Sequence, residues 1–441
     1  MSSIDLLHWR HHPDALTVKD GDLGCFSGGA FLDSDKTAYL TFWKFPAADG
    51  SDKGGAALAK ARPPYDHWTR IEPLAVESGA DWGVTELSDG THISSADPFN
   101  IWKADGWYYM LSGNKPVLDV HGREETSDPR YKGDWLDLFR SQDLKKWDYV
   151  HRFYDNPRPA ETWPDETEDN MCPTFLPLYD APDQGSFTGK WLLSFISHNK
   201  GTQYYIGSLE NETFLPESHG RMSWVDKGFF APEAMTDDRN RHILWAWLLG
   251  LHETEFRDFG WSGVFSLPRC LWLEDGTLRM APVEELERLQ YNHQSFPPAL
   301  CRNDLFLPVK NGRSFRMKAV IDMSRCELAG FRVLANSDGD EYTDIYFDKA
   351  GSFLAMDTTN SGKWGWKALE QAPFTLEENE KLRLDIFVDN SVVEVFANDR
   401  QAIARRVFPT HTWDALGVHM IGVNAQLDSL DVWEMMPSNP Y

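Results

Sequence analysis

Short apolar and aromatic runs, each bounded by glycine, proline, asparagine or aspartate, recur from one end of the chain to the other. Runs of this length and composition predict β-strands. They lie at Thr37–Trp43, Trp107–Ser112, Lys190–Ser197, Gln203–Ser208, His242–Leu249, Gly330–Ala335, Asp344–Phe347, Leu382–Val388 and Ser391–Ala397. Sustained helical periodicity is nearly absent, and the one clear helical stretch is short, around Val283–Leu289. The sequence therefore predicts an all-β protein.

An internal repeat indicates how the first strands are organised. The segment SIDLLHW at residues 3–9 matches SQDLKKW at 141–147, and YDHW at 65–68 is a weaker copy. The copies return at intervals longer than one hairpin, which favours one copy per blade of a β-propeller.

The chain has 441 residues, which is long enough for two domains. After the helical stretch, Ser295-Phe296-Pro297-Pro298 predicts a linker, and beyond it the strands follow one another more closely. Their alternation is typical of a β-sandwich. We therefore expect one domain over residues 1–290 and a second over residues 296–441.

Charge and composition exclude several functions. Lys and Arg total 43 against 68 Asp and Glu, a formal charge of −25, which disfavours nucleic acid and anionic membranes as partners. Five scattered cysteines without CxxC spacing and 14 dispersed histidines argue against a disulfide framework, a metal site or a cofactor. The first twelve residues are polar and predict no signal peptide, which implies a cytoplasmic protein if the start is complete.

Aromatic residues are abundant, with 19 Trp, 14 Tyr and 26 Phe. Most are explained by sheet packing, but aromatic faces also stack against sugar rings. An acidic β-propeller rich in aromatic residues suggests glycoside chemistry, which usually needs two carboxyl groups flanking the scissile bond.

Three segments could supply such a site. Gly24–Ala30 is a glycine-rich turn in which Phe26 could stack on a sugar and Ser27 could hydrogen-bond to it. Asp97 precedes Pro98, which favours an extended backbone at Asp97. Residues 165–175 run from crowded carboxylates, which raise one another's pKa, into an apolar strand. A blade turn, an Asp-Pro turn and a solvated acidic loop are the structural alternatives.

Read together, these segments resemble glycoside hydrolase family 32. In chain order the similar segments are DLLHW at 5–9, FSG at 26–28, DP at 97–98, EDNMCPTF at 168–175, FFAPE at 229–233, WSG and LPR within 261–269, PVEEL at 282–286 and DNSVVEVFAND at 389–399. They follow the family's order over almost the whole chain, which is more specific than any single motif.

The resemblance implies a five-bladed β-propeller followed by a β-sandwich, and retaining hydrolysis or transfer of a β-D-fructofuranosyl group without a metal. By the same resemblance Asp97 would bind fructose hydroxyls and stabilise the oxocarbenium-like transition state, and Phe26 and Ser27 would line the fructose subsite. The general acid would be Glu168, with Glu166 and Asp169 as the next candidates.

Three positions depart from the family pattern. Met171 stands where the family has a glutamate directly before Cys-Pro, and Ala96 replaces the arginine before Asp97. No Asn-Asp-Pro, the family's nucleophile motif, occurs before Asp22. We therefore expect an incomplete first blade, either because the sequence starts late or because the lineage lacks the nucleophile.

Three functions remain open at this point. The first is a hydrolase of sucrose, fructo-oligosaccharides or fructan. The second is a fructoside-binding protein without catalysis, which the departures favour. The third is a propeller acting on arabinosides or xylosides, against which the segment at 389–399 speaks. The partner in the first two is a small fructoside, and the oligomeric state is left open.

Overall fold

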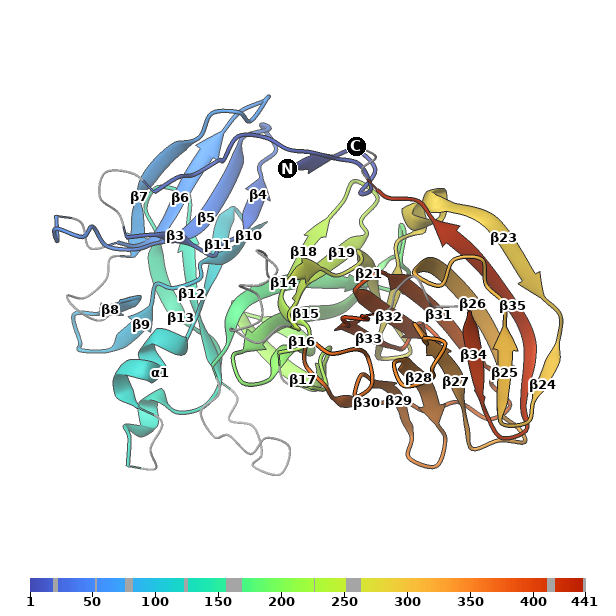
Figure 1. Ribbon diagram of the computed structural model, residues 1–441. Helices are drawn as coiled ribbons and strands as arrows, with labels where there is room; N and C mark the ends of the chain where they lie inside the picture. Colours follow the sequence, from blue (N-terminus) through green and yellow to red (C-terminus); the bar gives the residue numbers. More distant parts are fainter. Residues whose placement is uncertain are drawn as a thin grey trace.

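The computed structural model describes residues 1–18, 23–51, 54–75, 82–122, 126–155, 169–225, 227–250, 263–410 and 417–438. Antiparallel strands make up most of it and form two groups of sheets, which lie side by side in Figure 1. The predicted all-β fold is confirmed.

The first group consists of sheets whose strands follow one another in chain order, as in propeller blades. One is β3 (Cys25–Phe26), β5 (Ala38–Lys44), β6 (Gly55–Ala61) and β7 (Thr69–Ala75), with β4 (Ala30–Leu32) also on β5. The next are β10 (Phe99–Ala104), β11 (Trp107–Gly113), β12 (Trp135–Ser141) and β13 (Asp148–Asp155), then β14 (Met171–Tyr179), β15 (Phe187–Ser197), β16 (Gly201–Glu210) and β17 (Thr213–Arg221). The last is β18 (Phe230–Thr236), β19 (His242–Leu248), β21 (Arg269–Glu274) and β22 (Thr277–Pro282), with β20 (Val264–Phe265) on β19.

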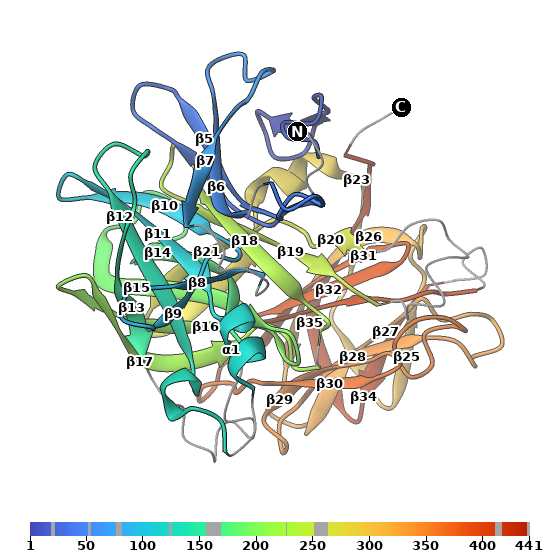
Figure 2. The same cartoon turned by 90° about the vertical axis from the view of Figure 1, so that its left-hand side faces the viewer.

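These sheets fan out at the left and centre of Figure 2. Before them the described residues contain only the pair β1 (Ser2–Ser3) and β2 (Trp9–Arg10), and β8 (Val84–Glu86) pairs with β9 (His92–Ser94) between the first two blades. The propeller architecture is therefore present with four full blades among the described residues.

The sequence repeat marks one type of turn. Asp5 Oδ1 accepts hydrogen bonds from the backbone N–H groups of Leu7 and His8, at 3.1 and 2.9 Å. Asp143 Oδ1 accepts from Lys145 and Lys146, both at 2.9 Å. The leucine after each aspartate is left-handed, with φ of 62° and 60°. One copy joins β1 to β2 and the other joins β12 to β13, as expected for a repeated blade element.

The second group of sheets is a β-sandwich, as predicted. Its first sheet runs β23 (Gln290–Phe296), β35 (Ala425–Met435), β26 (Ser314–Asp322), β31 (Leu382–Asp389), β32 (Val392–Ala397) and β33 (Gln401–Arg406), with β24 (Ala299–Cys301) also on β35. The second runs β25 (Asp304–Leu307), β34 (Val418–Gly422), β27 (Leu328–Val333), β28 (Thr343–Asp348), β29 (Phe353–Asp357) and β30 (Leu369–Pro373). Their facing side chains form one buried apolar core.

One prediction of local structure is wrong. The predicted linker begins inside a strand, since Ser295 and Phe296 pair with Asp431 and Leu430 in the sandwich sheet. The predicted helical stretch around Val283–Leu289 is confirmed as a 3-10 helix, η2 (Glu284–Leu289), whereas an α-helix that was not predicted, α1 (Lys115–His121), follows β11. With seven residues α1 is too short to show periodicity, and tertiary contacts bury its first turn.

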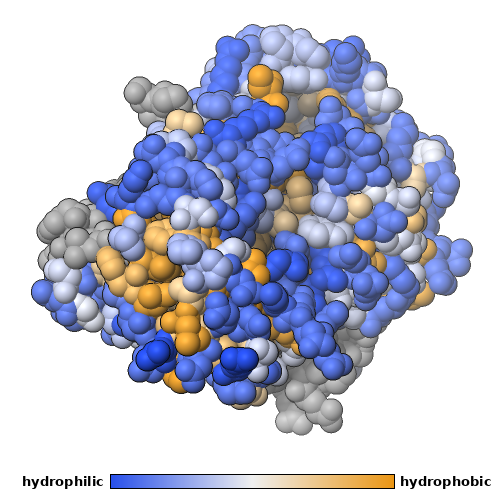
Figure 3. Space-filling model, turned by 90° about the vertical axis from the view of Figure 1, so that its right-hand side faces the viewer, coloured by the Kyte–Doolittle hydropathy of each residue, from blue (hydrophilic) through white to orange (hydrophobic). Residues whose placement is uncertain are grey.

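The surface agrees with the acidic composition. Figure 3 shows the sandwich side as mainly hydrophilic, with one larger apolar area at the lower left and smaller apolar spots elsewhere. Among the described residues, none of the helices has the length and apolar character needed to cross a bilayer.

Candidate active site

The innermost strands of three blades begin with the same local geometry. Asp97, Cys172 and Ala231 each precede a proline and each have a left-handed backbone, with φ of 42°, 50° and 46°. In β14 and β18 the strand register shifts across this step, as in a β-bulge, whereas in β10 the shift comes after it, between Phe99 and Trp102. The predicted extended backbone at Asp97 is therefore wrong, because the contacts that bury Asp97 outweigh the preference set by Pro98.

These three steps meet in one apolar cluster. It contains Ala96, Phe99, Met171, Cys172 and Ile196, with Trp43, Phe230 and Ala231 packed against it. The members come from the blades of β5, β10, β14 and β18, so the cluster is the floor on which the inner strands converge. Left-handed non-glycine residues are uncommon and concentrate at functional sites.

Asp97 lies on this floor with 7% of its surface exposed. Its Oδ2 accepts a hydrogen bond from the Cys172 thiol at 3.4 Å. Burial raises the pKa of Asp97 to about 6, although Cys172 and His198 oppose the shift. Asp97 is therefore a carboxylate above that pH, and among the described residues no arginine contributes to its pKa.

Asp169 lies beside Asp97 and is held by His198. The His198 ring Nδ1 lies 2.5 Å from Asp169 Oδ2, and the His198 backbone N–H donates to the same carboxylate at 3.2 Å. Asp169 raises the pKa of Asp97 by charge repulsion, which shows that the two carboxyl groups are close. The structure thus brings together two of the acidic residues that the sequence singled out.

A buried network fixes the segment between Asp169 and Cys172. The side-chain amide of Asn170 donates to Asp134, which also accepts from the hydroxyls of Tyr154, at 2.6 Å, and Tyr205. Met171 follows with 3% exposure. The position at which the family has its glutamate therefore carries no titratable group here.

Phe26 and Ser27 lie on the blade that faces β18. Phe26 is 51% exposed and stacks on Phe45 with ring centroids 4.0 Å apart. Ser27 is exposed too, and its backbone carbonyl accepts a hydrogen bond from the Trp43 backbone N–H at 3.0 Å. Next to them Gly28 approaches the neighbouring strand so closely that a Cβ would lie 1.8 Å from the Thr41 carbonyl oxygen. Only glycine fits there.

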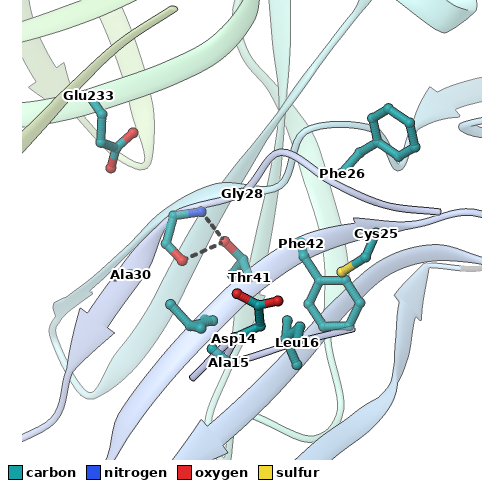
Figure 4. Close-up of a pocket in the computed structure, with 12 residues that line it drawn as sticks. Asp14, Ala15, Leu16, Cys25, Phe26, Gly28, Ala30, Thr41, Phe42 and Glu233 are labelled. Atoms are coloured by element: carbon teal, nitrogen blue, oxygen red, sulfur yellow. Dashed lines mark hydrogen bonds between the residues drawn. The ribbon is translucent and has the colours of Figure 1, made fainter. Parts of the chain in front are cut away.

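A cavity of about 490 Å³ opens between this blade and β18. Phe26, Gly28 and Phe42 line one side together with Asp14, and Glu233 lies on the other side (Figure 4). Ser27 lies between Phe26 and Gly28 in the chain but is not one of the residues that line the cavity.

Glu233 is a functional candidate to which the sequence assigned no role. Its Oε2 is buried and has no hydrogen-bond partner among the described residues. Burial raises the pKa of Glu233 to about 8, so the group is protonated at neutral pH. In the sequence, its position directly after the Ala231-Pro232 step, which is equivalent to the Asp97-Pro98 step, could have indicated a role for Glu233.

The predicted acids Glu166 and Glu168 lie outside the described residues.

Two family models cover the chain. The glycosyl hydrolases family 32 N-terminal domain matches residues 1–282, and the family 32 C-terminal domain matches residues 283–434. The chain belongs to glycosyl hydrolases family 32. The predicted family is confirmed, and so is the expectation of a glycoside hydrolase.

Individual relatives agree with this membership. The sucrose-6-phosphate hydrolase of Zymomonas mobilis is 25% identical over 99% of this chain and 83% of its own length. A levanase of Bacillus sp. is 27% identical over 98% of this chain and 47% of its own length. The exo-inulinase of Aspergillus awamori has a similar structure, with a TM-score of 0.78 at 19% identity over 99% of this chain and 89% of that one. The propeller-and-sandwich fold is confirmed by such neighbours.

Proposed function

We propose that this family 32 protein hydrolyses β-D-fructofuranosides such as sucrose, fructo-oligosaccharides or fructan. The proposal rests on Asp97, a carboxyl group buried on the floor where the inner strands converge. The relatives of this chain include a sucrose-6-phosphate hydrolase and levanases. A structural neighbour, fructan 1-exohydrolase IIa of Cichorium intybus, has been solved in complex with 1-kestose.

In this proposal the ionised Asp97 binds fructose hydroxyls and stabilises the positive charge that develops on the sugar in the transition state. The face of Phe26 packs against the sugar ring, and the Ser27 hydroxyl hydrogen-bonds to it. Glu168 is the proton donor that the family motif suggests, with Glu166 behind it. Asp169 is less suited to donate a proton, because it accepts hydrogen bonds from His198.

A second candidate function is fructoside binding without hydrolysis. The buried Met171 favours it, because a thioether cannot deliver a proton to the leaving group. Without a proton donor the glycosidic bond would stay intact, while the aromatic and polar groups of the site would still bind the sugar.

The test is the release of fructose from sucrose, 1-kestose and inulin by the wild type and by Asp97→Asn. We expect turnover by the wild type and a loss of about 10²–10³-fold in kcat for Asp97→Asn, since one charge-stabilising group is removed. Asp35→Asn is the matched control, because Asp35 is an exposed partner of Arg62 on a blade surface. Calorimetric binding of fructosides without any turnover by the wild type would instead establish the second function.

A further inference from the structure

Glu233 has a position that the proposed hydrolysis does not yet use. It lies on β18, the innermost strand of its blade, and lines the cavity opposite Phe26 (Figure 4). A carboxyl oxygen that is buried without a partner is costly, so it is rarely retained without a ligand or a chemical role. The open volume beside it is large enough for a sugar unit.

We propose that Glu233 donates the proton that releases the leaving group from the fructoside. This inference rests on the proposed hydrolysis and assigns its proton-donating step to Glu233 in place of Glu168. Glu233 would thus do what the family's motif glutamate does, from a different blade, in a chain whose motif position is occupied by Met171.

The surroundings keep Glu233 in the form that can donate. Burial is the only resolved cause of its raised pKa, and none of the described cations offsets it by an ion pair. The titratable groups near it are acidic: Asp14 lines the same cavity, and the Cys172 thiol lies close enough for Glu233 to raise its pKa. Asp97 and Asp169, the latter with His198, lie beyond Cys172.

The other described groups on the floor are less able to act as the acid. Cys172 already donates its thiol hydrogen to Asp97, and burial raises its pKa well above the usual value. Asp169 is an acceptor for His198. Asp97 has a lower pKa than Glu233, about 6 against about 8, so it ionises first and serves as the negative charge.

As the bond between the anomeric carbon and the glycosidic oxygen breaks, the oxygen keeps the bonding pair and takes the proton from Glu233, leaving as an alcohol. The cationic sugar centre is stabilised by the Asp97 carboxylate. A water molecule then adds its oxygen to the anomeric carbon and returns a proton to Glu233, so that free fructose and the original acid are restored.

The experiment compares Glu233→Gln with the wild type on two substrates, sucrose and p-nitrophenyl β-D-fructofuranoside. Glutamine keeps the shape and neutrality of the protonated side chain but cannot transfer a proton. We expect kcat on sucrose to fall by about 10²–10⁴-fold. The nitrophenolate needs no proton to leave, so we expect less than about a tenfold loss on the aryl substrate.

Glu217→Gln is the matched control, because Glu217 is an exposed residue of β17 that pairs with Lys190 of β15. Glu168→Gln tests the competing acid. Calorimetric binding of fructose to Glu233→Gln, with an affinity like that of the wild type, shows that the variant is folded and that its pocket is intact.

The outcomes separate the two proposals. Full activity of Glu233→Gln on sucrose, or an equal loss on both substrates, overturns the role of Glu233 while hydrolysis by the wild type still supports the proposed function. A loss confined to sucrose in Glu168→Gln but not in Glu233→Gln also overturns it. A wild type that turns over neither substrate contradicts the hydrolase function itself, and the assigned proton transfer with it.

Discussion

Two carboxyl groups in one site differ because of what surrounds each of them. Asp97 receives a hydrogen bond from Cys172 and favourable charge from His198, whereas Glu233 receives neither and is only desolvated. Their pKa values, about 6 and about 8, bracket neutral pH. Such a separation is what allows one carboxyl group to act as a charge and another as an acid.

The raised pKa of Glu233 predicts how stability changes with pH. Between the ordinary value of 4.5 and about 8, the folded protein keeps a proton that the unfolded chain loses, so the free energy of unfolding falls as pH rises. Glu233→Gln removes this loss, and we expect its stability advantage over the wild type to grow from pH 5 to pH 8 by up to about 1.4 kcal/mol per pH unit. Urea unfolding at pH 5, 6.5 and 8 measures the difference.

Glu217→Gln provides the control of opposite sign. Lys190 lowers the pKa of Glu217, so that carboxylate adds stability above its unfolded pKa, and its loss should destabilise the protein slightly at pH 8. A stability advantage of Glu233→Gln that stays constant across this pH range would contradict the prediction.

At the scale of elements, a buried ion pair joins a blade strand to a sandwich strand. Arg269 on β21 and Glu394 on β32 are 1% and 0% exposed, and Arg269 Nη2 donates to Glu394 Oε2 at 2.8 Å. Glu394 Oε1 also accepts from the Leu267 backbone N–H at 2.6 Å, and the guanidinium lies 4.4 Å from the Phe229 ring centroid. Because the ion pair needs one hydrogen-bond geometry, it fixes the orientation of the two strands relative to each other.

We expect either Arg269→Met or Glu394→Leu to lower the free energy of unfolding by about 3–5 kcal/mol, because each leaves a buried charged partner uncompensated. The double variant with Arg269→Met and Glu394→Leu should recover much of this loss, since an apolar pair needs no desolvation of charge. Denaturant unfolding of the three variants forms the double-mutant cycle. Strictly additive losses would show that the two side chains do not act as a pair.

Across the whole molecule, the propeller and the sandwich share one buried apolar cluster. Ile243 and Leu271 of the last blade pack in it with Phe387 and Phe396 of the sandwich. A backbone hydrogen bond from Met280 to Asp399, at 2.8 Å, adds to this contact. Interfaces of this apolar kind hold domains in a fixed relation, in contrast to the polar contacts of mobile domains.

We therefore expect the two domains to unfold in one thermal transition. Phe396→Ala should cost about 3–5 kcal/mol, because it opens a cavity at the shared cluster, and should lower the transition of the whole protein. Phe306→Ala is the control, since Phe306 is an exposed sandwich residue with 47% exposure. Differential scanning calorimetry with two resolved peaks in the wild type would contradict this coupling.

The sequence by itself determined the strands, the Ser-x-Asp-Leu turns and the family, because strand pattern and turn chemistry are local and the motifs keep their order along the chain. Asp97 was singled out in the same way and lies buried on the floor, and Phe26 lines the cavity. The roles of Asp97, Phe26, Ser27 and Glu168 stay predictions.

The left-handed backbone at Asp97, the short helix α1 and the protonated Glu233 were decided only by the tertiary structure. Cys172 contacts Asp97 across 75 residues of sequence, and Glu233 comes to the same floor from a further blade. Burial and charge at that floor are sums over strands that meet only after folding. No local pattern contains those sums, so the acidity of a side chain there follows from the packed molecule.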